Sequence, residues 1–382
     1  LGLNDRNLVE ELSREAQQLS KLDWNSSETS FDFERLIFLD NISTSIQEDW
    51  GKTGAYLQSK TSRLREIEVA INESFIDKLN LENNISSNVK LEEISLYGNP
   101  AYSSSSSLNN TQFYRVYFTN QMASYVVGCM MGRYSLDREG LVYAHSGNNG
   151  FKDLVTEGAY KSFPADDDGI IPLAAEEWLF EDDATVRFKE FVKTIWGAEQ
   201  LTENLDFVAE SLCLDAIKPL STKNSGGEGA MDTIRRYFST QFYKDHLKTY
   251  KKRPIYWLFS SGKEKAFECL VYLHRYNEGT LARMRTEYVT PLMGKIETQI
   301  ALRSESIANA ESTAEKNRLT KELKSLEKKQ TELRAFDEEL KHFAEMKISL
   351  DLDDGVKVNY GKFGNLLADV KDIHGQKPEQ IK

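Results

Sequence analysis

A segment in the C-terminal half of this sequence combines two residue types that bind nucleic acids, cations and aromatic rings. From residue 235 to residue 303 there are fourteen Lys and Arg against six Asp and Glu, although the formal net charge of the whole chain is −12. Cations at this density neutralise phosphates, and interleaved rings can stack on bases. We therefore predict contact with double-stranded DNA. The cations expected to hold phosphates, without reading the base sequence, are Lys251, Lys252, Arg253, Lys263, Arg275, Arg283 and Arg285.

The aromatic residues of this segment also fit a simpler role. Ile255-Tyr-Trp-Leu-Phe259 is a short apolar run flanked by charges, which is typical of a buried strand. We expect these rings to lie in the core and the flanking cations to face the polyanion.

An acidic region offers a competing partner for the cations. Residues 166–210 hold thirteen carboxylates against three cations. Such runs are usually solvated helix faces, but this one could pair with the basic segment inside the same chain. The alternative hypothesis is therefore a protein-interaction scaffold that recruits other proteins without direct DNA contact.

Asn99-Pro-Ala-Tyr102 is close to the Asn-Pro-Pro-Tyr loop of adenine N6-methyltransferases. In that loop the Asn and a prolyl carbonyl bind the target amine while the aromatic ring stacks on the flipped base. Here the second proline is absent, no glycine-rich turn for S-adenosylmethionine precedes the motif, and its surroundings are a Ser/Asn loop. We expect an ordinary turn and no catalysis at this position.

Two glycine-containing motifs resemble phosphate loops but lack their requirements. Ser260-Ser-Gly-Lys263 has the right ending, yet Trp257 occupies the position of the necessary upstream glycine. The glycines at 226–229 have no strand before them. Neither motif is predicted to bind a nucleotide.

The remaining motifs for catalysis are equally weak. Glu322-Leu-Lys324 and Glu339-Leu-Lys341 match the end of a nuclease signature, but they fall in a region of coiled-coil spacing, where Glu and Lys are expected. The five histidines have no metal-ligand spacing, and no nucleophile is accompanied by a base. We predict no catalytic residue, no metal and no cofactor in this chain.

The bulk composition is that of a folded protein with two or three domains. Its 382 residues are 40% hydrophobic, which is enough for ordered cores. Three distant cysteines allow neither a disulfide framework nor a four-cysteine zinc site, so a reducing compartment is expected. No apolar run has the length of a membrane span and no signal segment is present, so we predict a cytoplasmic location. Because the chain starts at Leu1, we expect it to be a piece of a longer polypeptide.

Helical periodicity dominates the sequence. Apolar residues recur at helical spacing in six stretches, which are residues 3–22, 43–81, 112–134, 174–196, 199–216 and 231–249. Low helix propensity at Gly51 and Gly54 could kink the second of these. Residues 355–363 are expected to be extended and to be followed by a helix through Val370.

The spacing near the C-terminus predicts two long helices. A helical run begins near Glu278, and we expect Pro291 to interrupt or kink it. Ser312 and Glu315 form an S-x-x-E capping box, so a new helix is expected there, followed by a leucine heptad to about residue 346. Together these predict an antiparallel helical hairpin, whose arms of about 30 residues would reach roughly 45 Å at ~1.5 Å per residue.

The predicted fold class is mainly α, a multi-helix region with minor β-strands and a long antiparallel helical hairpin near the C-terminus. The predicted divisions are an N-terminal helical region (1–82), a polar Ser-rich loop or linker (83–110), a central mainly helical domain (111–290), the hairpin (291–346) and a C-terminal tail that packs back on the domain (347–382).

Several blocks of this sequence resemble, in the same order, blocks of the PglX family, the large adenine-specific DNA methyltransferases of BREX phage-defence systems. Asp23-Trp24 with Phe31-Asp-Phe33 is similar to the family's D-W…E-T-S-W-D-F, with Phe31 in place of a tryptophan. The longest block covers residues 243–263 and continues at 273–277. The other similar blocks are residues 125–137, 140–145, 168–172, 177–183 and 355–363.

The resemblance implies the C-terminal half of an enzyme that methylates host adenine at N6 within a phage-exclusion system, related to fused restriction-modification enzymes. The family's S-adenosylmethionine site and its Asn-Pro-Pro-Tyr loop belong to an upstream domain, so Asn99 does not correspond to them. This chain is then expected to be a non-catalytic region that binds DNA and orients domains, with other BREX proteins as further partners. The sequence gives no indication of its oligomeric state.

Overall fold

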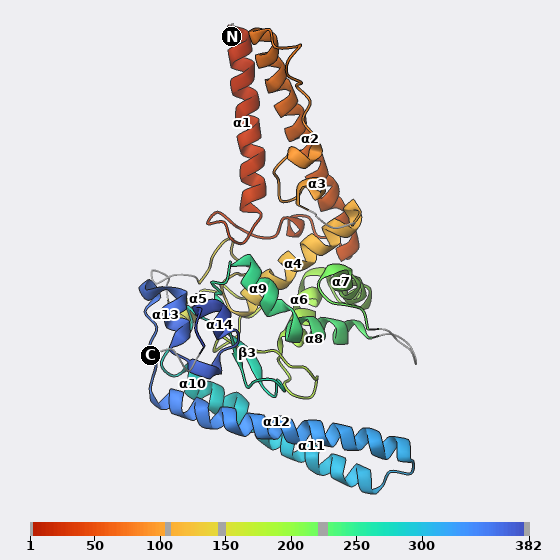
Figure 1. Cartoon of the computed structure of the whole chain (residues 1–382), viewed down its shortest axis with the longest axis vertical. Coiled ribbons are helices and arrows are strands. Elements are labelled where there is room, and N and C mark those ends of the chain that lie inside the picture. The colour runs from red at the N-terminus through yellow and green to blue at the C-terminus, as the bar shows by residue number, and fades with distance from the viewer. Residues whose placement is uncertain (1–2, 104–107, 144–149, 221–227, 378–382) are drawn as a thin grey trace. The chain divides into compact units, whose positions relative to one another are not determined.

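The computed structural model of the chain describes residues 3–103, 108–143, 150–220 and 228–377. It is mainly α-helical with one small sheet, which confirms the predicted fold class (Figure 1). In these ranges, none of the helices combines the length and the apolar character needed to cross a bilayer. The packing divides the chain into two compact units. Unit 1 comprises Leu1–Val126, Arg138–Leu141 and Phe191–Ala230, and unit 2 comprises Val127–Asp137, Val142–Glu190 and Met231–Lys382.

Two long helices, α1 (Leu3–Asn25) and α2 (Ile46–Leu79), lie side by side in unit 1 (Figure 1). The Ser45 side chain caps the N-terminus of α2, and Asn80 ends the helix in the left-handed conformation, at φ 52°. Their apolar faces meet because the hydrophobic residues recur at helical spacing. The buried residues of this core are Leu19, Leu64, Ile67, Val89, Ile94 and Leu96.

The polar stretch after α2 belongs to unit 1 and packs onto the same core, since it supplies the last three of those residues. It contains the 3-10 helix η2 (Leu91–Glu93) and the short helix α3 (Pro100–Ser103). A sequence stretch rich in Ser and Asn thus still contributes apolar side chains to a packed region.

The rest of unit 1 is built around aromatic side chains. It contains η1 (Ile37–Leu39), α4 (Asn110–Met130) up to residue 126, and α7 (Leu201–Asp215). α2 continues through Gly54, where an added Cβ would lie 2.8 Å from Cδ2 of Tyr114, so the glycine permits the close approach of α4. The rings that pack together here are Phe38, Trp50, Phe118, Trp196 and Phe207.

Unit 2 contains the sheet, in which all strand pairs are antiparallel. Its strands are β1 (Ile170–Pro172), β2 (Tyr256–Ser260) and β3 (Glu268–Tyr272), in the order β1-β3-β2. In the register, Phe259 pairs with Cys269 on β3. The predicted strand at 255–259 is therefore correct to within one residue. Its three rings are at most 1% exposed, which confirms their core role: Tyr256, Trp257 and Phe259.

Short helices complete unit 2, and two predicted helices need correction. The bounds are α5 (Phe151–Thr156), α6 (Ala184–Trp196, which belongs to unit 2 up to residue 190), α8 (Ala230–Thr240), α9 (Phe242–Thr249), α13 (Gly355–Gly361) and α14 (Val370–His374). The helix predicted at 174–196 begins ten residues later, because the carboxylate of Asp183 accepts hydrogen bonds from the amides of Thr185 and Val186 and so caps α6. The single helix predicted at 231–249 is two helices, divided at Gln241, whose φ of −122° is not helical.

The extended conformation predicted at 355–363 is also wrong. Residues 355–361 form α13, preceded by the 3-10 helix η4 (Leu352–Asp354) and followed by η5 (Gly364–Leu366). Tyr360 and Phe363 are fully buried and contact the ring of Trp257 on β2. Packing against the sheet thus determines the local structure of this segment, although Val356, Val358 and Tyr360 have a high propensity for strands.

The final helices begin with α10 (Thr280–Arg283), which continues through a π-helical turn (Met284–Val289) into α11 (Thr290–Ala308). Pro291 stands at the start of α11 and follows the π turn, whose wider hydrogen bonding accommodates the missing N–H and the bulk of the ring. Ser312 caps α12 (Thr313–Glu345) by accepting a hydrogen bond from the amide of Glu315. α11 and α12 lie side by side (Figure 1), and the Arg303–Glu322 and Arg334–Glu297 ion pairs join them.

Candidate nucleic-acid interface

α9 and the turn that follows it carry five cations within ten residues of unit 2. Phe242, Tyr243, His246 and Leu247 form the buried face of α9, so the helix directs the opposite face to solvent. Lys244 and Lys248 are four residues apart on that exposed face. We call this set the basic turn, defined by Lys244, Lys248, Lys251, Lys252 and Arg253.

The backbone of the basic turn adopts a conformation that is costly for lysine. The amide of Lys252 donates to the carbonyl of Leu247, and the amide of Lys251 donates to that of Lys248, which is the Schellman pattern of a helix end. Lys251 and Lys252 are both left-handed, with φ of 50° and 60°. Glycine is the usual residue in such a position, because a Cβ is unfavourable there. Two consecutive lysines in this conformation therefore persist only because the surrounding structure holds them.

Hydrogen bonds on the sheet side of the turn supply that support. Nε2 of His246 accepts from the amides of Ile255 and Tyr256, at 3.1 and 3.2 Å. Nε1 of Trp257 donates to the carbonyl of Pro254 at 3.1 Å. Burial lowers the pKa of His246 to about 3, with a smaller contribution from the Arg133 cation. His246 therefore remains a neutral acceptor at physiological pH and fixes the path of the chain into β2.

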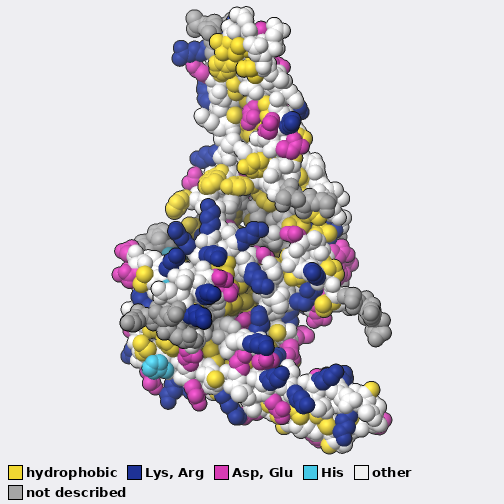
Figure 2. All heavy atoms as spheres, in the orientation of Figure 1, with side chains coloured by type: hydrophobic (Ala, Val, Ile, Leu, Met, Phe, Trp, Pro, Cys, Tyr) yellow, Lys and Arg dark blue, Asp and Glu magenta, His cyan; other side chains and the backbone are white. Residues whose placement is uncertain are grey.

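The five cations of the basic turn are accessible. Each is exposed, and in the described ranges none of them forms an ion pair within 4.0 Å. Figure 2 shows dark-blue Lys and Arg side chains gathered over the α9 region of this face. The carboxylate among them, Asp245, accepts hydrogen bonds from Gln241 and Tyr237 on the helix side. A rigid turn with a local excess of positive charge can bind phosphates.

The seven predicted site residues occupy different environments. Lys251, Lys252 and Arg253 lie together in the basic turn, as described. Lys263 is exposed as well, on the loop between β2 and β3. The amides of that loop are already bound, because the Glu332 carboxylate accepts from Ser261 Oγ at 2.7 Å and from the amides of Glu264 and Ala266 at 2.7 and 3.2 Å. The Ser260-Ser-Gly-Lys263 loop therefore holds a carboxylate of its own chain where a phosphate loop would hold phosphate.

Arg275 is committed to the interior of unit 2. Its guanidinium donates to the carbonyls of Asp166 and Asp167 at 2.6 Å, and it lies 3.5 Å from the centre of the Phe151 ring. Burial lowers the pKa of this arginine. These contacts hold the loop before β1 against the end of β3.

Arg283 and Arg285 are paired with carboxylates. Arg285 binds Asp337 of α12 through two hydrogen bonds, at 2.8 and 3.0 Å, and this interaction raises the arginine's pKa. Arg283 forms an exposed ion pair with Glu287, four residues along the helix. Arg285 thus joins the π turn to α12.

The acidic region finds cationic partners within unit 2, but they are not residues of the basic turn. Asp183 is fully buried and paired with Arg235 of α8, and Glu176 pairs with Lys329 of α12 at 2.6 Å. The hydroxyl of Tyr288 donates to Asp168, whose pKa burial raises to about 7, with the neighbouring Asp166 adding to the effect. Part of the acidic segment therefore stabilises the fold of unit 2.

Lys244 and Lys248 were not among the seven predicted residues. The available signal was their i, i+4 spacing immediately before Lys251, which places cations on one helix face next to the turn. The sequence prediction of one helix from 231 to 249 obscured this, since it gave no reason to treat residues 242–249 as a separate element.

The Asn-Pro-Ala-Tyr motif lies at the start of the short helix α3 in unit 1. Asn99 is buried, and its Nδ2 donates to the carbonyls of Leu91 and Ile94, both at 2.8 Å, while its Oδ1 accepts from the amide of Ala101. The side-chain amide is thus saturated by its own chain and is not presented to a base. The motif predicted as an ordinary turn is the first turn of the short helix α3, in which the amide of Ser103 donates to the carbonyl of Asn99.

The described residues do not fit an S-adenosylmethionine site. Cofactor binding in α/β folds uses a glycine-rich turn after a strand of a parallel sheet, whereas the sheet here is antiparallel. Across the described ranges, no group of three or more His, Cys, Asp or Glu side chains is placed to hold a metal ion. The glycines at 226 and 227 and His145 lie outside the described residues.

Comparison with known proteins gives an alignment along nearly the whole chain. Over 378 residues, 98% of the chain, it is 53% identical to the adenine-specific methyltransferase BrxX of Escherichia coli O9:H4 (strain HS). Over 362 residues, 93% of the chain, it is 34% identical to the adenine-specific methyltransferase PglX of Lacticaseibacillus casei (strain Zhang). No family model matches the chain.

The chain spans only 30% and 27% of the lengths of these two relatives. The resemblance to the PglX family inferred from the sequence blocks is confirmed, and the chain is homologous to a part of these methyltransferases.

Proposed function

We propose, from this homology to a part of the PglX-family methyltransferases, that the chain is a non-catalytic, DNA-contacting region of an adenine-specific DNA methyltransferase that acts in phage defence. The observation that carries the proposal is the basic turn, with five exposed cations on a backbone held in one conformation. In this proposal the methyl transfer and its cofactor belong to an upstream domain of the whole protein, as the resemblance to the family implies.

The basic turn would contact the sugar-phosphate backbone of duplex DNA. Lysine and arginine side chains that reach phosphates position a protein on DNA without reading its sequence. Lys251, Lys252 and Arg253 are central to this contact, Lys244 and Lys248 extend it along α9, and Lys263 and Arg283 lie elsewhere on unit 2. The guanidinium groups of Arg275 and Arg285 bind within the protein, so in this proposal these residues stabilise the fold and do not contact DNA.

The helices α11 and α12 would serve as a spacer or docking arm that orients domains or recruits other proteins of the defence system. The support is their polar exterior: exposed charged residues follow the outer face of α12, among them Lys321, Lys324 and Lys328. A helix pair of this kind is suited to protein contacts away from the DNA.

Fluorescence anisotropy on a labelled DNA duplex, measured across a salt series, tests the proposal. The observed affinity should fall with salt, and the triple variant K251A/K252A/R253A should reduce the slope of log affinity against log salt by about 2.7, since each lost phosphate contact contributes ~0.9. At low salt the affinity of this variant should be at least tenfold weaker.

The matched control is K321A/K324A/K328A, which removes the same charge from α12 and should leave the slope nearly unchanged. Absence of DNA binding at low salt, or equal losses in the two triple variants, would overturn the proposal. A salt-resistant complex with other defence proteins, combined with no DNA affinity, would instead support the protein-interaction scaffold. Methyl transfer or plasmid cleavage by the isolated chain would contradict its non-catalytic assignment.

A further inference from the structure

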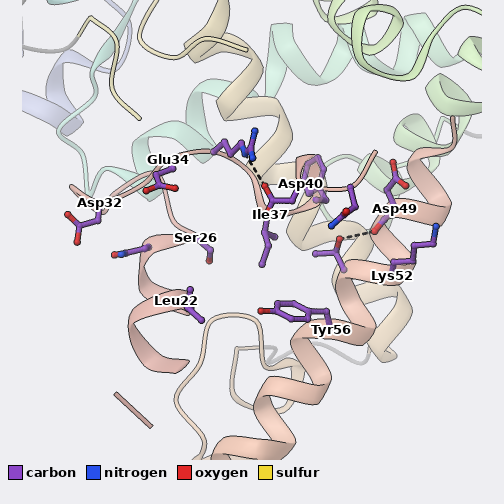
Figure 3. A pocket seen from close by; sticks show the side chains of 14 residues that line it. Leu22, Ser26, Asp32, Glu34, Ile37, Asp40, Asp49, Lys52 and Tyr56 are labelled. Atoms are coloured by element: carbon purple, nitrogen blue, oxygen red, sulfur yellow. Dashed lines mark hydrogen bonds and ion pairs between the residues drawn. The ribbon is translucent and has the colours of Figure 1, made fainter. Parts of the chain in front are cut away.

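Unit 1 has a groove at the junction of α1 and α2 that the DNA-contacting proposal does not use. A cavity of about 800 Å³ lies between the end of α1, residues 32–41 and the first turns of α2 (Figure 3). A second cavity of about 500 Å³ adjoins it, and the two share the lining residues Asn25, Asp32 and Glu34. Because the two cavities share these residues, we treat them as one groove.

Exposed apolar side chains line this groove. Leu22, Ile37 and Tyr56 point into the first cavity (Figure 3), and Leu22 and Tyr56 are 59% and 43% exposed. Phe31, in the lining of the second cavity, is 97% exposed. Because the Phe31 side chain is exposed, it contributes no hydrophobic stabilisation to the fold of the isolated chain. Exposed apolar groups of this kind mark interaction surfaces.

The charge of the groove is negative. Five carboxylates line the two cavities against three cations, Lys21, Arg35 and Lys52. Three of the carboxylates are already bound: Asp49 accepts from the amide of Ser43 and from Nε1 of Trp196, and Arg35 pairs with Asp40 at 2.9 Å and with Glu139 at 3.8 Å.

The carboxylates that remain available lie on the wall shared by the two cavities. Asp32 and Glu34 are both exposed, on either side of Phe33, which is 1% exposed and packs edge-on against Tyr125. The contact of Asp32 with Lys21, at 3.5 Å, is an exposed pair that contributes little. Glu34 forms no ion pair within the described part of the chain. The buried ring therefore anchors a segment that presents two carboxylates to the groove.

We propose that this groove binds a basic segment of a protein partner. Apolar side chains of the segment pack against Leu22, Tyr56 and Phe31, and a lysine or arginine binds between Asp32 and Glu34. The negative wall disfavours nucleic acid, and the exposed apolar residues require more than a bare cation. The Phe31-Asp-Phe33 block, which has no part in the basic turn, supplies part of this wall. The inference is independent of DNA binding, because every residue in it belongs to unit 1 and none to the basic turn.

Fluorescence anisotropy with the full chain and two labelled octapeptides tests the inference. One peptide alternates Lys or Arg with Leu or Phe, and the other replaces each cation by Asp or Glu. We expect the basic peptide to bind at least tenfold more tightly than the acidic one. D32N/E34Q should weaken the basic peptide at least fivefold, and F31A/Y56A at least threefold, while circular dichroism shows the unchanged helical content that these exposed positions predict.

The matched control is E11Q/E82Q, which removes two exposed carboxylates of unit 1 that do not line the groove and should change the affinity less than twofold. Spermidine serves as a third ligand, being basic without apolar side chains. Equal binding of the two peptides, equal losses in D32N/E34Q and E11Q/E82Q, or spermidine binding as tightly as the basic peptide would each overturn the inference. Because none of these readouts involves DNA, failure here leaves the function of the basic turn unaffected.

Discussion

The cations of the basic segment from 235 to 303 fall into two groups, those exposed in the basic turn and the arginines bound within the protein. In the basic turn, the cations are exposed and in the described ranges form no ion pair. The embedded arginines, Arg235, Arg275 and Arg285, instead bind a buried carboxylate, backbone carbonyls and a carboxylate of α12. The difference shows that one basic segment of a sequence can contain both cations that are free to bind a partner and cations that stabilise the fold. Only the packing of the chain determines which role each cation has.

The comparison predicts opposite consequences of removing a charge in the two parts. The largest effect is expected for Arg235→Ala, which leaves the fully buried Asp183 without its cation. Breaking a buried pair in this way costs about 3–5 kcal/mol of unfolding free energy. Urea denaturation should detect this loss, whereas Lys252→Ala should change the unfolding free energy by less than ~0.5 kcal/mol. Similar losses in both variants would remove the distinction.

The support beneath the basic turn should be sensitive to pH. The pKa of His246 is lowered to about 3 in the fold from an unfolded value near 6.5, so the unfolded chain binds the extra proton between these values. The contribution of His246 to the unfolding free energy is therefore fully present above pH 6.5 and is lost as the pH falls toward 3. Between pH 7 and pH 5 this residue should lower the unfolding free energy by about 2 kcal/mol.

Denaturant titrations of the wild type and of His246→Gln at the two pH values measure this contribution. The variant should be less stable at pH 7 and should lack this pH-dependent loss. An unchanged pH dependence in the variant would show that His246 does not titrate as the buried acceptor of the turn.

A smaller effect is expected at the junction of the π turn with α12. Arg285→Ala removes two hydrogen bonds to Asp337, and because the arginine is 33% exposed, we expect a loss of about 1 kcal/mol. Thermal unfolding gives the stability change, and anisotropy on duplex DNA gives the second readout. DNA affinity should be nearly unchanged; a tenfold decrease would move Arg285 from the embedded group to the binding surface.

The smallest effect concerns the strained backbone of the basic turn. Lys251→Gly removes the unfavourable Cβ at a φ of 50°, and we expect the unfolding free energy to rise by about 0.5–1 kcal/mol while DNA affinity falls. Lys347→Gly is the control, because this exposed lysine has a φ of 48° outside the basic turn. It should gain similar stability without losing affinity. Equal changes in DNA affinity for the two variants would show that the strained lysine at 251 has no specific role in binding DNA.

Several features of the fold were predictable because their signals are local. The capping box at Ser312 and Glu315 predicts the start of α12, and the apolar run at 255–259 predicts β2. The start of α6 was missed because its signal, the cap by Asp183, follows a long acidic loop that itself resembles a helix in composition. The division between α8 and α9 at Gln241 was missed because no glycine or proline marks it.

The candidate interface shows the same limit. Lys251, Lys252 and Arg253 are visible in the sequence as a cluster of charge, and no long-range contact is needed to expect them at a surface. Arg275 carries an identical side chain only a short distance along the chain, but its environment depends on carbonyls more than a hundred residues away. Composition cannot distinguish an exposed cation from one that is bound inside the fold, since the residue types are the same.

The sequence by itself determined the mainly helical class, the position of the central strand, the resemblance to the PglX family and the existence of a basic segment. The tertiary structure decided which of those cations remain available, because burial and long-range hydrogen bonds commit a guanidinium to the fold irrespective of its neighbours in sequence. It also placed Phe31 and Tyr56 beside carboxylates of the same groove, a juxtaposition that depends on where α1 ends relative to α2. Local residue patterns encode elements, whereas the free energy of packing determines which side chains are left for partners.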